Sequence, residues 1–252
     1  MLEKFKIEFP AYTGNEERNV YVYLPLNYQS NKKYPVLYCF DGHNLFKDED
    51  ATFGRAWHLD KYLDNNKVDL IVIGVECHQG RNREREHEYS PFEFSYRIKG
   101  KKDGFYGKET LDWFVNTLKP LIDKKYKTLS NRDNTFIMGS SMGGIMASYA
   151  LINYNDVFSR ACSLSPAYFI YRENAIKNFE INKRIKKDSY LYTDYGTKDL
   201  CIKIAMPIFN DINNMFIKSR INVTSRIIYD GIHNEASWEK QLVFAINVLM
   251  YK

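Results

Sequence analysis

Hydrophobic positions near the N-terminus of the chain repeat with a period of two residues. Residues 4–10 and 19–25 both alternate apolar and polar side chains, and the stretch YTGNEER between them has the composition of a turn. Alternation on both sides of a turn is typical of paired strands. The sequence therefore predicts that the fold begins with an antiparallel pair.

Farther along, nearly continuous apolar runs alternate with segments of helical periodicity. Continuous runs are typical of strands that are buried on both faces, and strands separated by helices indicate a mostly parallel sheet. The sequence thus predicts an α/β fold with helices on both faces of the sheet. The expected strands are residues 34–42, 68–77, 134–139, 159–165, 189–196 and 223–231, and the expected helices lie near 53–66, 107–126, 143–154, 202–219 and 236–251.

Two segments interrupt this alternation. Residues 78–106 are polar, aromatic and irregular, and residues 166–187 also lack a clear strand or helix pattern. Long connections within compact domains are often functional, so we expect both segments to cover a pocket. There is no internal repeat or low-complexity linker, and the prediction is a single domain over residues 1–252. Pro120, within an otherwise helical stretch, predicts a kink or a shorter helix there.

The composition excludes several classes of protein. No run of about 18 apolar residues is present, so we expect no membrane span. The first ten residues, MLEKFKIEFP, lack the apolar core of a secretory signal, which favours a cytoplasmic location. The formal net charge is +5, and the basic clusters RIKGKKDG and NKRIKKD occur without any nucleic-acid-binding motif. These clusters are therefore interpreted as solvated surface rather than a nucleic-acid site.

Cysteine and histidine offer few metal ligands. Cys39, Cys77 and Cys162 lie within apolar runs and are interpreted as core thiols. His78 and His87 flank the long polar segment but lack the spacing of metal ligands, and EREHEYSP around His87 is interpreted mainly as a solvated charge run. His58 is assigned a structural role. No metal or other cofactor is predicted.

The strongest chemical signal is a G-x-S-x-G motif between an expected strand and an expected helix. Gly139, Ser141 and Gly143 form it, and Ser140 is an alternative hydroxyl that lacks the flanking spacing. In this context the serine lies at the tip of a sharp turn, and the glycines let the strand and the helix approach closely. The free N–H groups of the helix N-terminus face the same point. The motif predicts a nucleophilic serine at position 141.

A serine hydroxyl needs a general base, and the base needs an orienting acid. For this type of turn the acid and then the histidine follow the serine along the chain, each after a later strand. His233 is the only histidine beyond Ser141 and follows a strand and a glycine turn. Asp199 follows an earlier strand and glycine turn and is favoured over Asp194, which lies within that strand.

An oxyanion intermediate requires two N–H donors. One is expected from Met142, which follows the nucleophile, and the other from the loop after an earlier strand. In that loop Gly42 permits a close approach, and the backbone N–H of His43 is the expected second donor.

Several motifs resemble the putative esterase family of α/β-hydrolases, which includes feruloyl and acetyl-xylan esterases, S-formylglutathione hydrolases and siderophore-trilactone esterases. The resemblance runs from about residue 34 to 240 and implies an α/β-hydrolase fold. The order of GSSMGG and GIHNEASW is specific to the family but not to one substrate. The matching stretches are YPVLYCFDGHNLF, IVIGVEC leading to REHEYSP, LKPLIDKKYKT, FIMGSSMGG, YGTKD and GIHNEASW.

The resemblance implies a serine nucleophile at 141, a base at 233 and an acid at 199, with the two oxyanion donors named above. The chain lacks the longer histidine-rich segment of the formylglutathione hydrolases and the secretion signal of plant-wall esterases, which leaves the substrate open. The expected function is hydrolysis of a small or medium acyl ester through an acyl-enzyme. The aromatic residues considered for substrate binding are Phe46, Trp57, Tyr89, Tyr168 and Phe169.

Other functions are compatible with the same residues. Hydrolysis of a siderophore trilactone or an acyl-thioester, and acyl transfer to an alcohol, would use the same triad. A non-catalytic binding module would be expected to lack one of its three members, and all three are present. The expected partner is a small-molecule ester, with no nucleic acid and no membrane, and homo-oligomer formation is left open.

Overall fold

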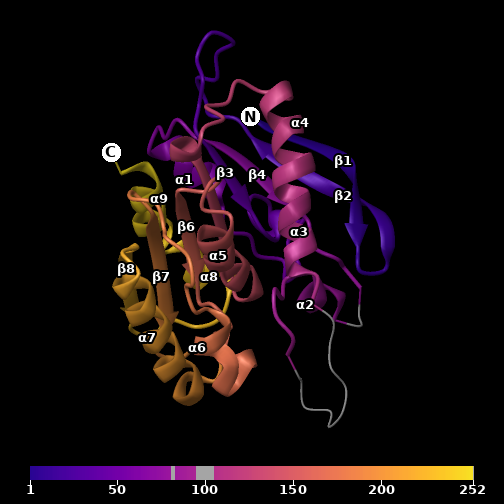
Figure 1. Ribbon diagram of the computed structural model, residues 1–252. Helices are drawn as coiled ribbons and strands as arrows, with labels where there is room; N and C mark the ends of the chain where they lie inside the picture. The colour runs from indigo at the N-terminus through magenta and orange to yellow at the C-terminus, as the bar shows by residue number, and fades with distance from the viewer. Residues whose placement is uncertain (81–82, 95–104, 252) are drawn as a thin grey trace.

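A computed structural model describes residues 1–80, 83–94 and 105–251 (Figure 1). Its strands form one eight-stranded sheet in the order β1-β2-β4-β3-β5-β6-β7-β8. The first two strands are antiparallel to each other, β2 is antiparallel to β4, and the remaining neighbours are parallel. The strands are β1 Leu2–Ala11, β2 Gly14–Tyr23, β3 Val36–Cys39, β4 Ile71–Val75, β5 Thr135–Ser140, β6 Arg160–Leu164, β7 Tyr190–Gly196 and β8 Asn222–Ile228.

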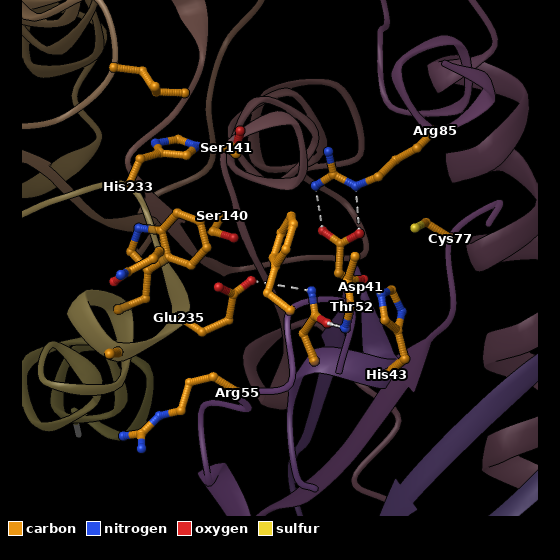
Figure 2. A pocket seen from close by; sticks show the side chains of 16 residues that line it. Asp41, His43, Thr52, Arg55, Cys77, Arg85, Ser140, Ser141, His233 and Glu235 are labelled. Carbon is orange, nitrogen blue, oxygen red and sulfur yellow. Dashed lines mark hydrogen bonds and ion pairs between the residues drawn. The ribbon is translucent and has the colours of Figure 1, made fainter. Parts of the chain in front are cut away.

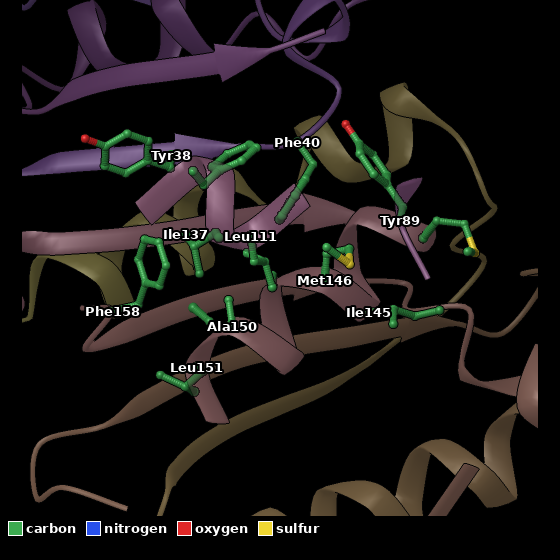
Figure 3. Close-up of a cluster of buried hydrophobic side chains, with 14 of the residues drawn as sticks. Tyr38, Phe40, Tyr89, Leu111, Ile137, Ile145, Met146, Ala150, Leu151 and Phe158 are labelled. Carbon is green, nitrogen blue, oxygen red and sulfur yellow. The ribbon is translucent and has the colours of Figure 1, made fainter. Parts of the chain in front are cut away.

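Helices cover both faces of the sheet. In β3, Val36 and Tyr38 pack into one buried cluster, whereas Leu37 and Cys39 pack into a second cluster on the opposite face. Figure 3 shows part of the first cluster, which includes residues from α3 and α5. The helices are α1 Leu59–Asn65, α2 Glu84–Glu88, α3 Gly107–Trp113, α4 Lys119–Lys125, α5 Met142–Asn153, α6 Ala175–Asn178, α7 Ile202–Lys218, α8 Glu235–Glu239 and α9 Leu242–Met250, with short 3-10 helices η1 Gly42–Asn44, η3 Arg132–Asn134 and η4 Tyr168–Asn174. The predicted fold class is confirmed.

Pro120 lies at the start of α4, directly after a π-helical turn (η2, Phe114–Leu118). Proline cannot donate the usual backbone hydrogen bond, and its ring crowds the preceding turn. A wider turn before it lets the helix continue. The segment from α3 to α4 is therefore interrupted at the expected place, but it is not shortened there.

Strand β8 differs from the expectation that the later strands are buried on both faces. It lies at the edge of the sheet, paired only with β7, and none of its seven residues is fully buried. The apolar run that predicted burial was therefore misleading in this strand. No helix in the described part of the chain is long and apolar enough to cross a membrane.

The charge run around His87 also differs from its interpretation as solvated surface. Residues 84–88 form helix α2, in which Glu84, His87 and Glu88 are buried. The Glu88 carboxylate accepts hydrogen bonds from the buried guanidinium of Arg18, one of them at 3.1 Å, and also from the N–H of His78. The segment thus packs against the sheet through an ion pair. The rest of the predicted long connection, at 81–82 and 95–104, lies outside the described residues.

Candidate active site

The serine of the G-x-S-x-G motif lies at the tip of a sharp turn between β5 and α5. Ser141 has φ 56° and ψ −117°, a left-handed backbone conformation that is uncommon for a residue with a side chain. A Cβ on Gly139 would lie 2.5 Å from the backbone of Gly143, so the strand and the helix approach each other more closely than side chains would allow. Ser141 is half-buried, whereas Ser140 and Met142 on either side are buried. The turn therefore brings the Ser141 hydroxyl to the surface of a cavity.

Two further glycines allow the loops that follow β7 and β8 to pack directly against each other. A Cβ on Gly196 would lie 2.2 Å from the carbonyl oxygen of Gly231, and the N–H of Lys198 donates a hydrogen bond to that oxygen at 2.9 Å. The β7 loop carries Asp199 and the β8 loop carries His233. Their side chains meet, with His233 Nδ1 2.6 Å from Asp199 Oδ1.

Asp199 is suited to remain ionised beside the imidazole. Burial acts to raise the pKa of Asp199, whereas the hydrogen bond and the charge of His233 act to lower it. The lowering effects together are larger, so the net pKa lies below the usual value. The same oxygen, Oδ1, also accepts a hydrogen bond from the N–H of Leu200 at 2.6 Å. A carboxylate held in this way stabilises an imidazolium and favours the tautomer with its proton on Nδ1.

Trp238 of α8 also packs against the imidazole. The two rings lie 5.0 Å apart between centroids and are nearly perpendicular, at 82°. The indole Nε1–H donates a hydrogen bond to the hydroxyl of Ser165, which follows β6. Tryptophan and the carboxylate together restrict the orientation of the His233 ring.

Ser141 and His233 line the same cavity, as Figure 2 shows. Among the hydrogen bonds of the described residues, none joins the Ser141 hydroxyl to the imidazole. Catalytic hydrogen bonds are often long in ligand-free structures and shorten when a substrate is bound. The arrangement therefore places the hydroxyl and the imidazole in one site without a formed hydrogen bond.

Asp194, the alternative acid, occupies a different environment. It lies within β7 and is only 1% exposed. Its carboxylate accepts hydrogen bonds from the N–H of Ser165 at 3.1 Å and from the hydroxyl of Tyr192 at 2.9 Å. Burial, aided by the charge of Asp199, raises the pKa of Asp194 to about 7. Asp194 neither contacts His233 nor lines the cavity.

This raised pKa predicts an effect of Asp194→Asn on stability. An aspartate in the unfolded chain ionises near pH 4, whereas folded Asp194 stays protonated until about pH 7, so the wild-type protein loses stability through this group as the pH rises from 4 to 7. Asparagine cannot ionise. The stability of the variant relative to wild type should therefore increase over this range, by on the order of 2–4 kcal/mol. Urea unfolding at pH 4.5 and pH 7.5 measures the difference, and a pH-independent difference would contradict the assignment.

Two backbone N–H groups are available to hold an oxyanion. Met142 is the first residue of α5, and His43 lies within the 3-10 helix η1 after β3. Neither N–H donates a hydrogen bond to any described residue. A Cβ on Gly42 would lie 2.3 Å from the backbone of Gly74, so the glycine allows the η1 loop to pack directly on β4. The structure thus leaves unoccupied donors on the two loops that were expected to supply them.

An ion pair between buried Asp41 and half-buried Arg85 lies beside these donors and was not anticipated. Arg85 of α2 donates two hydrogen bonds, both 2.7 Å long, to the carboxylate of Asp41 (Figure 2). Burial acts to raise the pKa of Asp41, but the Arg85 guanidinium lowers it to a net value below the usual one. Both residues line the cavity. Asp41 lies within YPVLYCFDGHNLF, one of the stretches that resemble the esterase family, and Arg85 lies within EREHEYSP, which was interpreted mainly as a solvated charge run. No local pattern in the sequence indicates that the two residues pair.

The side chains of Asp41, His43 and Cys77 lie close enough together to suggest a metal site, since their ligand atoms are within 4.8 Å of one another. The donor set fits poorly. Both carboxylate oxygens of Asp41 bind Arg85, whose positive charge would repel a cation. Burial also raises the pKa of the Cys77 thiol, so the thiolate that a metal requires is disfavoured. His43 instead has its Nε2 2.8 Å from the hydroxyl of Thr52.

The cavity has a volume of about 590 Å³. Phe53 and Leu200, which are 79% and 49% exposed, are apolar side chains among its lining. Sequence reasoning did not identify either of them, because nothing local distinguishes an exposed apolar residue beside a site from one elsewhere. The other lining residues that were not anticipated are Asn44, Thr52, Arg55, Asn234, Glu235, Ala236 and Trp238.

The aromatic residues considered for substrate binding do not line this cavity. Phe46 and Trp57 are buried in the second core cluster, Tyr89 and Tyr168 are buried in the first, and Phe169 packs against its margin. Their large apolar surfaces are used for core packing. Among the described side chains of segment 166–187, which was also expected to cover the pocket, none lines the cavity, whereas the described part of 78–106 contributes Arg85.

Comparison with known proteins agrees with this architecture. The model of the family described as "Putative esterase" matches residues 11–247. The uncharacterized protein YjcH of Bacillus subtilis (strain 168) is 27% identical over 243 residues, which cover 94% of this chain and 92% of YjcH. Two solved structures share the fold: the siderophore hydrolase EstA from Aspergillus nidulans (TM-score 0.73, 15% identity, 98% of this chain and 94% of that one) and a ferulic acid esterase from the anaerobic fungus Anaeromyces mucronatus (TM-score 0.67, 18% identity, 99% and 90%). The family match spans nearly the whole chain, which therefore belongs to this esterase family.

Proposed function

We propose that the protein is a serine carboxylic-ester hydrolase that acts through an acyl-enzyme. One observation carries the proposal: Ser141, held at a left-handed turn, shares a cavity with a histidine whose Nδ1 is hydrogen-bonded to a buried aspartate. This combination matches the requirements of an activated serine nucleophile.

The proposed reaction has two halves. Ser141 Oγ attacks the ester carbonyl while His233 Nε2 takes its proton, and the negative charge moves to the carbonyl oxygen. The N–H groups of Met142 and His43 hold that oxyanion. When the tetrahedral intermediate collapses, the bond to the alcohol breaks and His233 returns the proton to the leaving oxygen. Water then repeats these steps on the acyl-enzyme and releases the acid.

Throughout both halves the proposed role of Asp199 is electrostatic. Its lowered pKa keeps the carboxylate ionised, so it stabilises the imidazolium that forms when His233 accepts a proton. The Trp238 ring packs against the imidazole in an edge-to-face contact and helps to hold its orientation. No other group is needed to move the proton.

The substrate is proposed to be an ester with a small or medium acyl group. A cavity of about 590 Å³ is in the range of small-molecule sites. The two solved structures that share the fold are described as a siderophore hydrolase and a ferulic acid esterase. Hydrolysis of a siderophore trilactone is therefore the first alternative. Acyl-thioester hydrolysis and acyl transfer would use the same residues, and product analysis with an added acceptor alcohol distinguishes transfer from hydrolysis.

Labelling with a fluorophosphonate tests the proposal directly. We expect wild-type protein to be modified stoichiometrically within minutes, with the label mapped by mass spectrometry to Ser141 and not to Ser140. Both hydroxyls line the cavity, but Ser141 is half-buried at the tip of the turn, whereas Ser140 is buried at the end of β5. Label on Ser140 would reassign the nucleophile, and a protein that remains unlabelled while hydrolysing no ester would support a binding module instead.

A further inference from the structure

The ionisable side chains around the cavity are largely neutralised in pairs. Arg85 binds both carboxylate oxygens of Asp41, and His233 binds Asp199. Arg55 forms an ion pair with Glu239, the last residue of α8. Each of these groups therefore brings its own counter-charge or hydrogen-bond partner to the site.

The remaining ionisable groups of the lining are His43, Glu235 and the thiol of Cys77, whose pKa is raised by burial. Burial is the largest cause of the lowered pKa of His43, so its imidazole is neutral and binds Thr52. Glu235 forms no ion pair with any described residue. Its Oε1 accepts a hydrogen bond from the side-chain amide of Asn44 at 3.5 Å, which is at the limit for such a bond (Figure 2), and the carboxylate also interacts with the N–H of Glu235 itself.

Glu235 is buried as well as weakly paired. The residue is only 5% exposed, yet its side chain lines the cavity. Burial, reinforced by the charge of Asp41, raises the pKa of Glu235 above its usual value, while the hydrogen bond from its own backbone N–H and the charges of His233 and Arg85 act in the opposite direction. A carboxylate removed from water without a close counter-charge is unfavourable.

A structural role at the N-terminus of helix α8 accounts for the contact of this side chain with its own N–H, but not for its burial at the cavity. Helix α8 already has an N-cap residue, Asn234, whose side-chain oxygen accepts a hydrogen bond from the N–H of Ser237 at 2.9 Å. Glu235 follows the cap and projects into the cavity instead. An apolar or amide side chain at this position would fill the same space without the cost of a buried charge.

We propose that Glu235 makes this cavity selective for esters that carry a positively charged, ammonium-type group. Such a group supplies the missing counter-charge when the substrate enters, and a charge-assisted contact of this kind is among the stronger polar interactions. An anionic substrate would instead approach an unneutralised carboxylate. This inference rests on the proposed esterase function and adds a substrate class to it.

Matched pairs of substrates test the inference. Acetylcholine is compared with 3,3-dimethylbutyl acetate, which has carbon in place of the charged nitrogen, and p-nitrophenyl 6-aminohexanoate is compared with p-nitrophenyl heptanoate. The first pair places the charge on the alcohol and the second places it on the acyl group. We expect kcat/KM of the wild-type enzyme to favour the charged member of at least one pair by ~10-fold, mainly through KM.

In Glu235→Gln the ratio of kcat/KM for the charged ester to kcat/KM for its neutral counterpart should fall by ~10-fold, since glutamine keeps the shape but not the charge. The neutral member of each pair corrects for any general loss of activity. Asp230→Asn is the matched control, because Asp230 is a nearby exposed carboxylate that does not line the cavity; its ratio should equal that of wild type.

The outcomes separate the two proposals. Hydrolysis of the neutral esters without a preference in either pair, or a preference that survives in Glu235→Gln, overturns the selectivity and leaves the esterase function standing. Failure of the wild-type protein to hydrolyse any of the four esters overturns both.

Discussion

Ser141→Ala is expected to reduce kcat for ester hydrolysis by ~10⁴- to 10⁶-fold. The substitution removes the oxygen that forms the acyl-enzyme, and the remaining site provides only binding and oxyanion stabilisation. Alanine adds no new backbone strain, because the turn already holds a residue with a Cβ in the left-handed conformation. Hydrolysis of p-nitrophenyl acetate, followed with purified variant and wild type, measures the effect.

Ser140→Ala is the matched control for this experiment. Ser140 is the last residue of β5 and also lines the cavity, but it lies within the strand and not at the tip of the turn. Its removal should therefore cost far less activity than removal of Ser141. A Ser141→Ala protein that unfolds at the same urea concentration as wild type yet retains near-native turnover would refute the proposed nucleophile.

Asp199→Asn is expected to lower kcat by ~10³- to 10⁴-fold. The amide nitrogen of asparagine can donate a hydrogen bond to Nδ1 of His233, which favours the tautomer with the proton on Nε2. An imidazole in that tautomer cannot take the proton of the serine. The variant also loses the negative charge that stabilises the imidazolium.

The comparison with Asp194→Asn makes this result specific. Both substitutions remove a buried carboxylate, one within β7 and one in the loop that follows it, but only Asp199 is hydrogen-bonded to His233. We expect Asp194→Asn to retain most of the wild-type kcat. The opposite ranking of the two variants would reassign the acid to Asp194.

Much of the fold was predictable because its signals are local. Each of the eight strands lies within or beside a segment whose apolar pattern predicted it, and the glycines at 139, 196 and 231 mark turns that the structure contains. The preference for Asp199 over Asp194 as the partner of His233 also came from a local feature, since a residue beyond a glycine turn is free to leave the sheet. The observed hydrogen bond agrees with that reasoning.

The rest of the site depends on contacts between distant segments. Arg85 and Asp41 are 44 residues apart, and Asn44 and Glu235 are 191 apart. A charged run such as residues 84–88 has the same composition whether it is solvated or buried against a partner, so its burial was not predictable from its own residues. The aromatic residues could not be divided between core and cavity for the same reason.

The contact between Gly196 and Gly231 has a consequence for how this site can change. Because two main chains touch where side chains would otherwise lie, the spacing between the proposed acid and the proposed base is set by the backbone and is independent of whatever molecule enters. The neighbouring exposed residues Phe53 and Leu200 carry no such constraint. Substrate preference can therefore be altered at the rim while the machinery that moves the proton keeps its geometry.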